Sequence, residues 1–276
     1  MLAEVVAALD DVPAGVVLDA TVGGGGHAHA LLEAYPHLRL VGFDRDEDAL
    51  AAAGAALSRF GDRAVLRRAR FDRLDEVLDD LGVDQLAGAL FDLGVSSPQF
   101  DRPDRGFSYR SDAPLDMRMD RSDLGTAADV VNTYDERTLA RLFAQNGEDR
   151  FAGRIARAIV AARPLDTTGR LAEVVRSAIP AAARRTGGHP AKRVFQALRI
   201  EVNAELEVLP VALEAAIARL ARGGRLVVIA YHSGEDRIVK DRFLAAESGG
   251  CVCPPGLPCA CGAAPVARRV HRGARK

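Results

Sequence analysis

The feature that most constrains this sequence is an apolar run followed by an acid and, soon after, four consecutive glycines, within residues 16–27. Val16–Leu18 is typical of a buried strand, Asp19 follows it, and Gly23–Gly26 lead into a periodic apolar pattern typical of a helix. Glycine allows backbone angles that other residues resist and lets a ligand approach the main chain closely. Free amides at a helix start favour an electronegative ligand group. The stretch therefore predicts a strand, a tight turn and a helix at a ligand site.

Two ligands fit this turn. A second strand pattern, 38–44, ends in Asp44, about where a doubly wound fold places a carboxylate on a ribose hydroxyl. The spacing of Gly23, Gly25 and Ala28 matches a relaxed dinucleotide fingerprint, which keeps NAD open. Asp19 favours S-adenosylmethionine (AdoMet) instead, because a carboxylate suits a cationic amino-acid group better than a pyrophosphate. A glycine turn without a ligand is the third possibility, since such a fingerprint alone is a weak signal.

Composition excludes several classes of protein. The chain has 276 residues, of which 48% are hydrophobic and 27% charged, which is ordinary for a globular protein of one large or two modest domains. Its formal net charge is −1, so any nucleic-acid surface must be local. No apolar run approaches the roughly 20 residues of a membrane span, and the N-terminus lacks a signal-peptide pattern. We therefore expect a cytoplasmic protein with no membrane partner.

Strand and helix patterns alternate through the first part of the chain. Strands are predicted at 16–20, 38–44, 64–68 and 87–93, and helices at 3–9, 26–34, 46–59 and 72–81. This alternation indicates a parallel sheet with helices on both faces, whose ligands bind beyond the carboxyl ends of the strands. Asp19, Asp44, Phe71 and Asp92 each follow such an end, so we expect them on one rim.

The pattern changes after residue 93. Residues 94–120 are loop-like, 126–220 show helical periodicity, and a strand pattern returns at 224–231. Ser233–Asp236 then resembles a capping box that opens a further helix. The simplest interpretation is an α/β domain formed by residues 1–112 and 205–276, interrupted by a helical insertion at 113–204.

The residues after the fourth strand predict chemistry on an amine. Ser97-Pro98-Gln99-Phe100 resembles the Asp/Asn/Ser-Pro-Pro-aromatic motif of enzymes that methylate exocyclic amines. The lone pair of such an amine is delocalised into the ring, and acceptors for its N–H groups localise it and stabilise the charge that develops. A hydroxyl and a proline carbonyl supply acceptors, and an aromatic ring stacks the base. The alternative is a plain turn, since serine and proline are common there.

Clusters of arginine, several of them outside the α/β domain, suggest an RNA surface. Arginines alternate with aromatic residues through 100–110, and Arg150, Arg154 and Arg157 fall on one helix face. Such groups suit phosphates and stacked bases of single-stranded RNA, although a charge run is more often a solvated face. His232, after the late strand, is a low-ranking site residue, because a lone histidine is usually structural.

All four cysteines lie in one short segment. Cys251, Cys253, Cys259 and Cys261 form two Cys-x-Cys pairs, and four thiolates so close can bind zinc tetrahedrally. The alternative is reduced thiols in a loop, which a cytosolic protein favours.

Several motifs of the chain closely resemble one family. They are Asp92–Gln99, Arg105–Ser108, Pro114–Asp120, Phe195–Ile200 and His232–Lys240. They are similar to the RsmH (MraW) family, whose members are AdoMet-dependent methyltransferases acting on the N4 amine of a decoding-region cytidine in small-subunit (16S) rRNA. The resemblance implies a class I, Rossmann-like methyltransferase domain with an inserted all-helical domain that recognises the rRNA.

The resemblance also implies site residues. It assigns cofactor contacts to Gly25, Gly26, His27, Asp44, Phe71, Asp92 and Gln99. Asp44 then holds the ribose hydroxyls and Phe71 lies against the adenine, while Ser97, Pro98 and Phe100 are the candidate catalytic residues. Family members normally have several residues before the match to Leu2 and continue past Lys276 into a further strand, and without that strand a sheet edge near the late strands is expected to be exposed. A non-catalytic RNA-binding or ribosome assembly factor and an NAD-dependent oxidoreductase remain alternatives.

Overall fold

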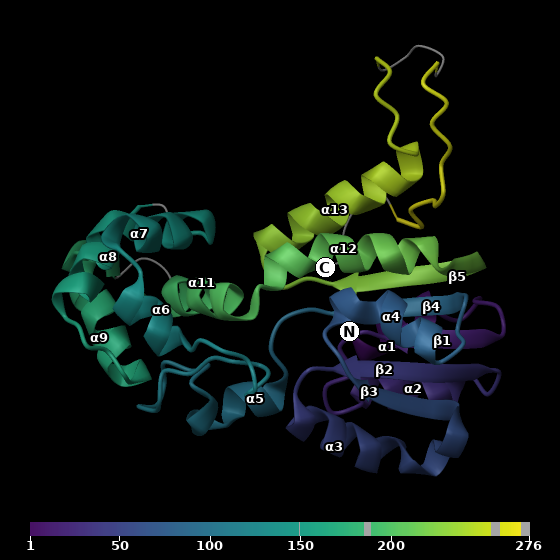
Figure 1. Ribbon diagram of the computed structural model, residues 1–276, viewed down its shortest axis with the longest axis horizontal. Helices are drawn as coiled ribbons and strands as arrows, with labels where there is room; N and C mark the ends of the chain where they lie inside the picture. Colours follow the sequence, from purple (N-terminus) through teal and green to yellow (C-terminus); the bar gives the residue numbers. More distant parts are fainter. Residues whose placement is uncertain (149, 185–188, 255–259, 272–276) are drawn as a thin grey trace. The chain divides into compact units, whose positions relative to one another are not determined.

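The computed structural model describes residues 1–148, 150–184, 189–254 and 260–271, without the side chains of Ser97, Pro98, Ala182 and Arg184. The chain divides into two compact units, Met1–Gly94 with Leu206–Lys276, and Val95–Glu205 (Figure 1). Residues 95–112 cluster with the helices of the second unit, which corrects the predicted boundary of the α/β domain at residue 112. The cause is the apolar side chains of this segment, which pack on the helical core.

In the described residues, the first unit contains one sheet of five parallel strands in the order β3-β2-β1-β4-β5. The strands are β1 (Gly15–Asp19), β2 (Leu38–Asp44), β3 (Ala64–Arg68), β4 (Leu86–Asp92) and β5 (Leu220–Ile229). In the register, Asp19 pairs with Gly42 of β2 and Leu90 of β4, and Asp92 pairs with Ile229. The predicted Rossmann-like α/β fold is confirmed, and its acids lie at the carboxyl ends of the strands.

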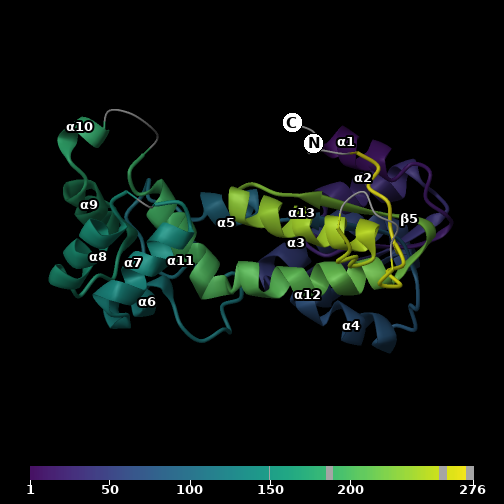
Figure 2. The same cartoon turned by 90° about the horizontal axis from the view of Figure 1, so that it is seen from above.

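Helices cover both faces of this sheet, as Figure 2 shows. On one face, α1 (Leu2–Ala8), α2 (Gly26–Ala34) and α3 (Glu47–Leu57) bury Val17, Leu38 and Leu40. On the other, α4 (Leu74–Asp80) and α12 (Glu205–Ala218) bury Phe43 and Phe91, and α13 (Ser233–Ser248) adds partly buried side chains to the same core. Both strand faces are therefore apolar, which explains why β4 is one continuous buried run before its terminal acid.

Two local predictions are wrong. The capping residue of α13 is His232 rather than Ser233: its Nδ1 accepts from the Glu235 amide at 3.4 Å, and the Glu235 carboxylate accepts from the His232 amide at 3.2 Å. An imidazole nitrogen serves here as the acceptor that a serine usually supplies. The stretch 94–120 is also not all loop, because α5 (Ser97–Asp101) and a 3₁₀ turn (Pro103–Arg105) lie within it.

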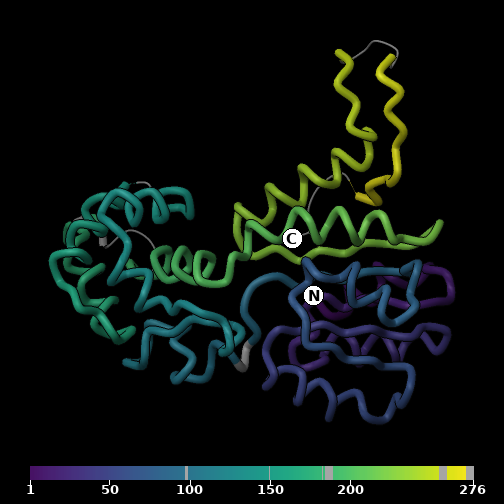
Figure 3. The backbone as a smooth tube through the Cα atoms, viewed as in Figure 1, coloured from purple at the N-terminus to yellow at the C-terminus, as the bar shows by residue number. Residues whose placement is uncertain are grey.

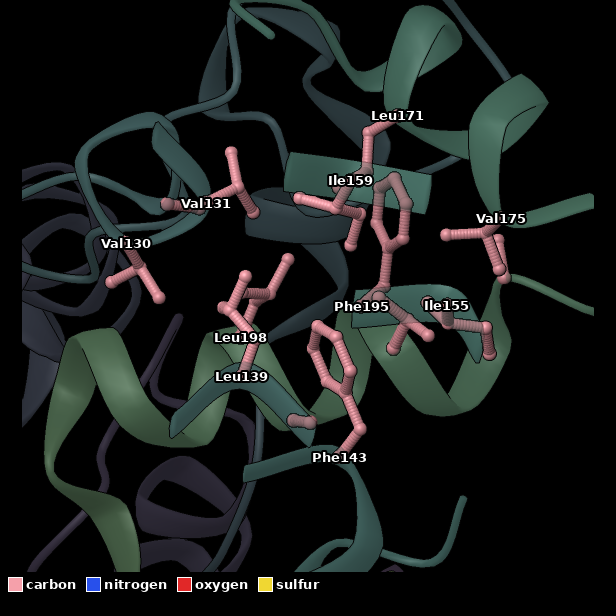
Figure 4. Close-up of a cluster of buried hydrophobic side chains, with 14 of the residues drawn as sticks. Val130, Val131, Leu139, Phe143, Ile155, Ile159, Leu171, Val175, Phe195 and Leu198 are labelled. Atoms are coloured by element: carbon pink, nitrogen blue, oxygen red, sulfur yellow. The ribbon is translucent and has the colours of Figure 1, made fainter. Parts of the chain in front are cut away.

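The second unit is a bundle of helices around its own core (Figure 4). Its helices are α6 (Ala127–Thr133), α7 (Glu136–Gln145), α8 (Ala152–Ala161), α9 (Thr168–Ala178), α10 (Ala181–Arg184) and α11 (Lys192–Asn203). Leu139, Phe143, Ile155 and Ile159 are fully buried and point toward one another from α7 and α8. The spacing of four residues within each pair places both members on one side of their helix, as the predicted helical periodicity requires.

A buried amide connects this bundle to the preceding loop. Asn203, 1% exposed, accepts a hydrogen bond from the Met119 amide at 2.8 Å and donates to the carbonyls of Met117 and Arg199, each at 2.8 Å. One side chain therefore satisfies backbone groups of two segments more than 80 residues apart. Among the described residues, no helix combines the length and the apolar character that a bilayer crossing requires.

Candidate cofactor site

Three acids form the rim of the first unit, and Asp19 is the most deeply buried of them. It ends β1, is 1% exposed, and accepts a hydrogen bond from the Thr21 amide at 3.2 Å. Burial, together with the nearby carboxylates of Asp92 and Asp44, raises the pKa of its carboxyl to about 7, against the lowering effect of the Thr21 amide. The site thus holds a carboxyl that a nearby positive charge would ionise.

Asp44 fixes the glycine turn. At the end of β2, its Oδ2 accepts from the Gly23 amide at 2.9 Å and its Oδ1 accepts from the Asp46 amide at 2.9 Å. Asp46 in turn caps α3 by accepting from the Asp48 amide at 3.0 Å. Burial raises the pKa of Asp44, while the two backbone donors act in the opposite direction. One carboxylate therefore ties the turn after β1 to the loop after β2.

The conformation of the turn requires glycine at one position in particular. Gly25 is the N-cap of α2 and has a left-handed φ of 83°. A β-carbon there would lie 3.3 Å from the Ala53 Cα and 3.5 Å from the Leu57 side chain, so α3 packs directly against the turn. Gly26 begins α2, and no atom lies within 4 Å of where its β-carbon would stand. The turn thus presents bare main chain beside the acids.

Asp92 connects four segments of the first unit. Its amide donates to the Thr21 hydroxyl at 2.7 Å, and its Oδ1 accepts from the Tyr231 hydroxyl at 2.9 Å. Its Oδ2 lies 3.5 Å from Nδ1 of His27, in the first turn of α2. The ends of β1, β4 and β5 and the start of α2 therefore converge on Asp92. Burial and hydrogen bonding to Asp92 raise the pKa of Tyr231 to about 12, so its hydroxyl stays a donor at neutral pH.

Phe71 supplies an aromatic edge to the same rim. It begins the 3₁₀ turn Phe71–Arg73 after β3, and its ring meets Phe91 edge-to-face at 5.7 Å between centroids. Phe71 is only partly buried, so part of the ring stays accessible. The structure brings Gly25, Gly26, His27, Asp44, Phe71 and Asp92 together at the carboxyl ends of the strands.

The chemistry of this rim suits a cationic nucleoside. Asp19, Asp44 and Asp92 bring up to three negative charges to the rim, and the imidazole Nδ1 of His27 lies 3.5 Å from the Asp92 carboxylate. A carboxylate at the end of β2 can accept from ribose hydroxyls, and a partly exposed ring can lie against a base. Two anionic phosphates would instead meet the repulsion of these acids.

The remaining predicted residues belong to the second unit. Ser97 and Pro98 are in the first turn of α5, and their side chains lie outside the described part of the structure. Gln99 is 6% exposed, and its Oε1 accepts from the Ser96 amide at 3.1 Å. Phe100 is partly buried against the helical core. The catalytic roles of Ser97, Pro98 and Phe100 and the cofactor contact of Gln99 stay predictions.

Part of the arginine-rich segment is structural. Arg105 is 2% exposed and donates to the carbonyls of Arg118 and Met119 at 3.0 and 2.9 Å, and Phe107 is 5% exposed in the core. These two residues are not available to RNA, because their side chains hold the loop to the helices. The sequence suggested a binding segment because buried and exposed arginines look alike without the fold.

Other arginines remain at the surface. Arg150, Arg154 and Arg157 are exposed at or beside α8, and Arg157 pairs with Glu136 at 3.2 Å. Arg150 lies over the ring of Phe151 at 5.0 Å. These side chains keep a cationic surface on the second unit.

Two residues of the rim were not predicted from the sequence. The sequence predicted Thr21 only as part of the turn, although its hydroxyl accepts a hydrogen bond from the Asp92 amide and so helps to position Asp92. The sequence placed Tyr231 at the end of the late strand and predicted no role for it. It is the first residue after β5 with a side-chain donor, and its hydroxyl donates to Asp92. Their position just past a strand end was the signal that could have identified them. His232, by contrast, is the cap of α13 described above.

Three of the four cysteines gather in the first unit. Ligand atoms of Cys251, Cys253 and Cys261 all lie within 4.8 Å of one another, and Cys259 lies outside the described residues.

Comparisons with known proteins add a family. A sequence model described as "MraW methylase family" matches residues 1–274. A protein of Mycobacterium sp. (strain KMS), named "Ribosomal RNA small subunit methyltransferase H", is 58% identical over 243 residues, which are 88% of this chain and 65% of that protein. Proteins of the same name from Thermobifida fusca and Symbiobacterium thermophilum are 59% and 53% identical, over 89% and 99% of this chain and 75% and 87% of their own lengths. The chain thus spans 65% of the length of the mycobacterial relative.

Proposed function

Because this chain belongs to the MraW methylase family, we propose that it is an AdoMet-dependent rRNA methyltransferase that acts on the exocyclic N4 amine of a decoding-region cytidine in 16S rRNA. Its partner is the small ribosomal subunit, and its place of action is the cytoplasm, where that subunit is assembled. The observation that carries the proposal is the acidic rim, in which Asp19, Asp44 and Asp92 meet a glycine turn at the carboxyl ends of β1, β2 and β4.

The charge of the rim favours AdoMet over NAD. AdoMet carries a sulfonium and an ammonium, which the carboxylates of Asp19 and Asp92 attract in a partly buried setting. NAD carries a pyrophosphate, which the same carboxylates repel. In the proposed complex, the amides of the glycine turn face the ligand, Asp44 accepts from the ribose, and Phe71 lies along the adenine. Cation attraction also explains how a carboxyl as buried as Asp19 is tolerated.

Methyl transfer needs an activated amine more than it needs a strong base. When bound, AdoMet would supply the methyl group: a bond would form from the cytosine N4 to the methyl carbon as the bond to sulfur breaks, the neutral thioether S-adenosylhomocysteine would leave, and the N4 proton would pass to solvent water. The Ser97 hydroxyl and the Pro98 carbonyl are proposed as acceptors of the two N–H groups, which keeps the lone pair directed at the methyl group. Phe100 is proposed to stack the extruded base.

The second unit is proposed to recognise the rRNA. Arg150, Arg154 and Arg157 offer guanidinium groups to phosphates, and these contacts act on the backbone rather than on sequence. In this proposal the α/β domain binds the cofactor and the helical domain binds the substrate.

The test is transfer of tritiated methyl from AdoMet to small subunits that lack their native base methylation, followed by nucleoside digestion and chromatography. We expect label in N4-methylcytidine. Asp92→Asn removes a charge from the rim, so it should weaken AdoMet binding by about tenfold or more, the effect of a charge-assisted contact. Asp84→Asn, on the exposed loop before β4, is the matched control and should leave binding unchanged.

Two results separate the methyltransferase proposal from the two alternative functions. Binding of AdoMet and of subunits without transfer of label would indicate a non-catalytic assembly factor. Binding of NADH but not AdoMet would indicate an oxidoreductase.

Ser97→Ala should lower the transfer rate while leaving AdoMet affinity unchanged, and an unchanged rate would remove Ser97 from the catalytic set.

A further inference from the structure

The segment that follows α13 folds back on itself and is tied to the end of that helix (Figure 3). Gly249 ends α13 with a left-handed φ of 63°. The Ala246 carbonyl then accepts from the Val266 amide at 3.0 Å, and Arg269 pairs with Glu247 at 2.6 Å. Two arms of the chain, one leaving α13 and one returning to it, therefore run close together.

The cysteines lie on these two arms. Cys251 and Cys253 are on the outgoing arm and Cys261 is on the returning arm, with their sulfurs all within 4.8 Å of one another. The sulfurs of Cys251 and Cys261 are 3.7 Å apart, and none of the three residues forms a disulfide in the described part of the chain. The Ala260 amide donates to the Cys253 sulfur at 3.3 Å. Such N–H donors stabilise a thiolate and orient it, as they do around metal-bound sulfur.

These distances match the edges of a metal tetrahedron. A disulfide brings its sulfurs to about 2.05 Å, far shorter than the separation between Cys251 and Cys261. In a tetrahedral zinc site with Zn–S bonds of about 2.3 Å, neighbouring sulfurs are about 3.8 Å apart. The sulfurs of Cys251 and Cys261 already have that spacing, and a single ion can reach all three.

The two arms have little apolar burial to hold them together. Val252, between the first two cysteines, is 86% exposed, and Val266 on the returning arm is 72% exposed. The hydrophobic effect scales with buried apolar area, so these side chains contribute little to closing the arms. A metal cross-link supplies that free energy in small segments without a core.

We propose that Cys251, Cys253 and Cys261 bind a structural zinc ion that closes the two arms after α13. Zinc fits because soft thiolates select it and because it adopts the tetrahedral arrangement that the sulfurs present. Each thiol that binds gives up its proton, so binding releases protons and strengthens as pH rises. The three described thiolates leave one position of the tetrahedron for a further ligand. The proposal concerns the stability of this segment and is independent of methyl transfer.

The test measures metal directly on the full chain. The reduced protein is loaded with zinc, dialysed, and assayed for zinc per chain by plasma mass spectrometry, and cobalt is then substituted for zinc. We expect about one zinc per chain and the absorption spectrum of tetrahedral thiolate-bound cobalt. Cys251→Ser, Cys253→Ser and Cys261→Ser should each lose most of the zinc, and Val252→Ala, the exposed neighbour, should keep it.

Every result decides the proposal. Wild-type protein with four titratable thiols and no zinc would overturn it, as would zinc that stays bound in all three serine variants. A cobalt spectrum without thiolate charge-transfer bands would overturn it too, and this result does not depend on any variant folding. Circular dichroism of the serine variants checks that the loss of zinc is local.

Discussion

Replacement of Asp19 by asparagine tests the most unusual electrostatic feature of the rim. Asp19 is 1% exposed and its carboxyl has a pKa of about 7, against 3.8 for the free side chain. Asparagine has nearly the same shape and can still accept from the Thr21 amide, so the substitution removes mainly the charge.

The direction in which the unfolding free energy changes with pH follows from the linkage between folding and proton binding at Asp19. The folded protein holds the Asp19 proton up to about pH 7, whereas the unfolded chain loses it near pH 3.8. Stability from this group is therefore fully present below pH 3.8 and is lost as pH rises toward 7. The complete loss is about 4 kcal/mol, and the part between pH 5 and pH 8 is about 2–3 kcal/mol.

The assay is urea unfolding of the ligand-free protein and of Asp19→Asn at pH 5 and pH 8. We expect the wild type to lose about 2–3 kcal/mol more than the variant over this interval, which leaves the variant the more stable protein at pH 8. Subtracting the unfolding free energy of the variant from that of the wild type at each pH cancels the contributions of the other titrating groups. The control Asp84→Asn should show the same pH dependence as the wild type. If the unfolding free energies of wild type and Asp19→Asn change equally between pH 5 and pH 8, the argument that Asp19 is buried and protonated is refuted.

Further predictions concern the ligand and the buried hydrogen bonds. AdoMet affinity should rise about tenfold between pH 6 and pH 8 in calorimetry, because a cation prefers ionised Asp19; a flat profile would contradict this. Thr21→Val leaves the Asp92 amide without its acceptor and should lower the unfolding free energy by about 1–3 kcal/mol, whereas Thr21→Ser should restore it. Asn203→Ala leaves the buried Met119 amide and Met117 carbonyl unpaired, so the unfolding free energy measured by calorimetry should fall by about 3 kcal/mol, and a loss below about 1 kcal/mol would show that water replaces the amide. Tyr231→Phe should weaken AdoMet binding about fivefold with little change in stability, and equal affinities would separate Tyr231 from the ligand.

The zinc proposal and the methyltransferase proposal make separate demands on the same chain. The first depends on thiols in the arms after α13, and the second on acids at the ends of the strands. A chain that binds AdoMet without zinc, or zinc without AdoMet, would therefore retain one proposal and lose the other.

The strands and the glycine turn could be predicted from the sequence because their causes are local. The ranges 38–44 and 64–68 matched the observed strands, since both are short stretches rich in apolar residues, as expected for strands of a sheet covered by helices. The position of Asp44 was predicted in the same way. Its hydrogen bond to Gly23, 21 residues away, required the sheet to place β1 beside β2.

The errors have a common physical origin in burial. Arg105 and Phe107 read as an exposed binding segment, yet both are buried, because the helical core accepts their side chains and backbone carbonyls satisfy the guanidinium. For His232, by contrast, the structural role that a lone histidine usually has is confirmed, since it caps α13. Residue type sets what a side chain can bond to, whereas burial depends on segments distant in the chain.

The sequence by itself determined the fold class, the family motifs and the acids that follow the strands, because these depend on periodicity and on residues adjacent in the chain. Only the tertiary structure decided that Thr21 and Tyr231 order Asp92, across 71 and 139 residues. It also decided that the pKa of Asp19 is raised and that the Cys251 and Cys261 sulfurs lie 3.7 Å apart. The physical reason is that desolvation, charge proximity and ligand spacing are distances in space, which the chain acquires only when the strands and arms are assembled.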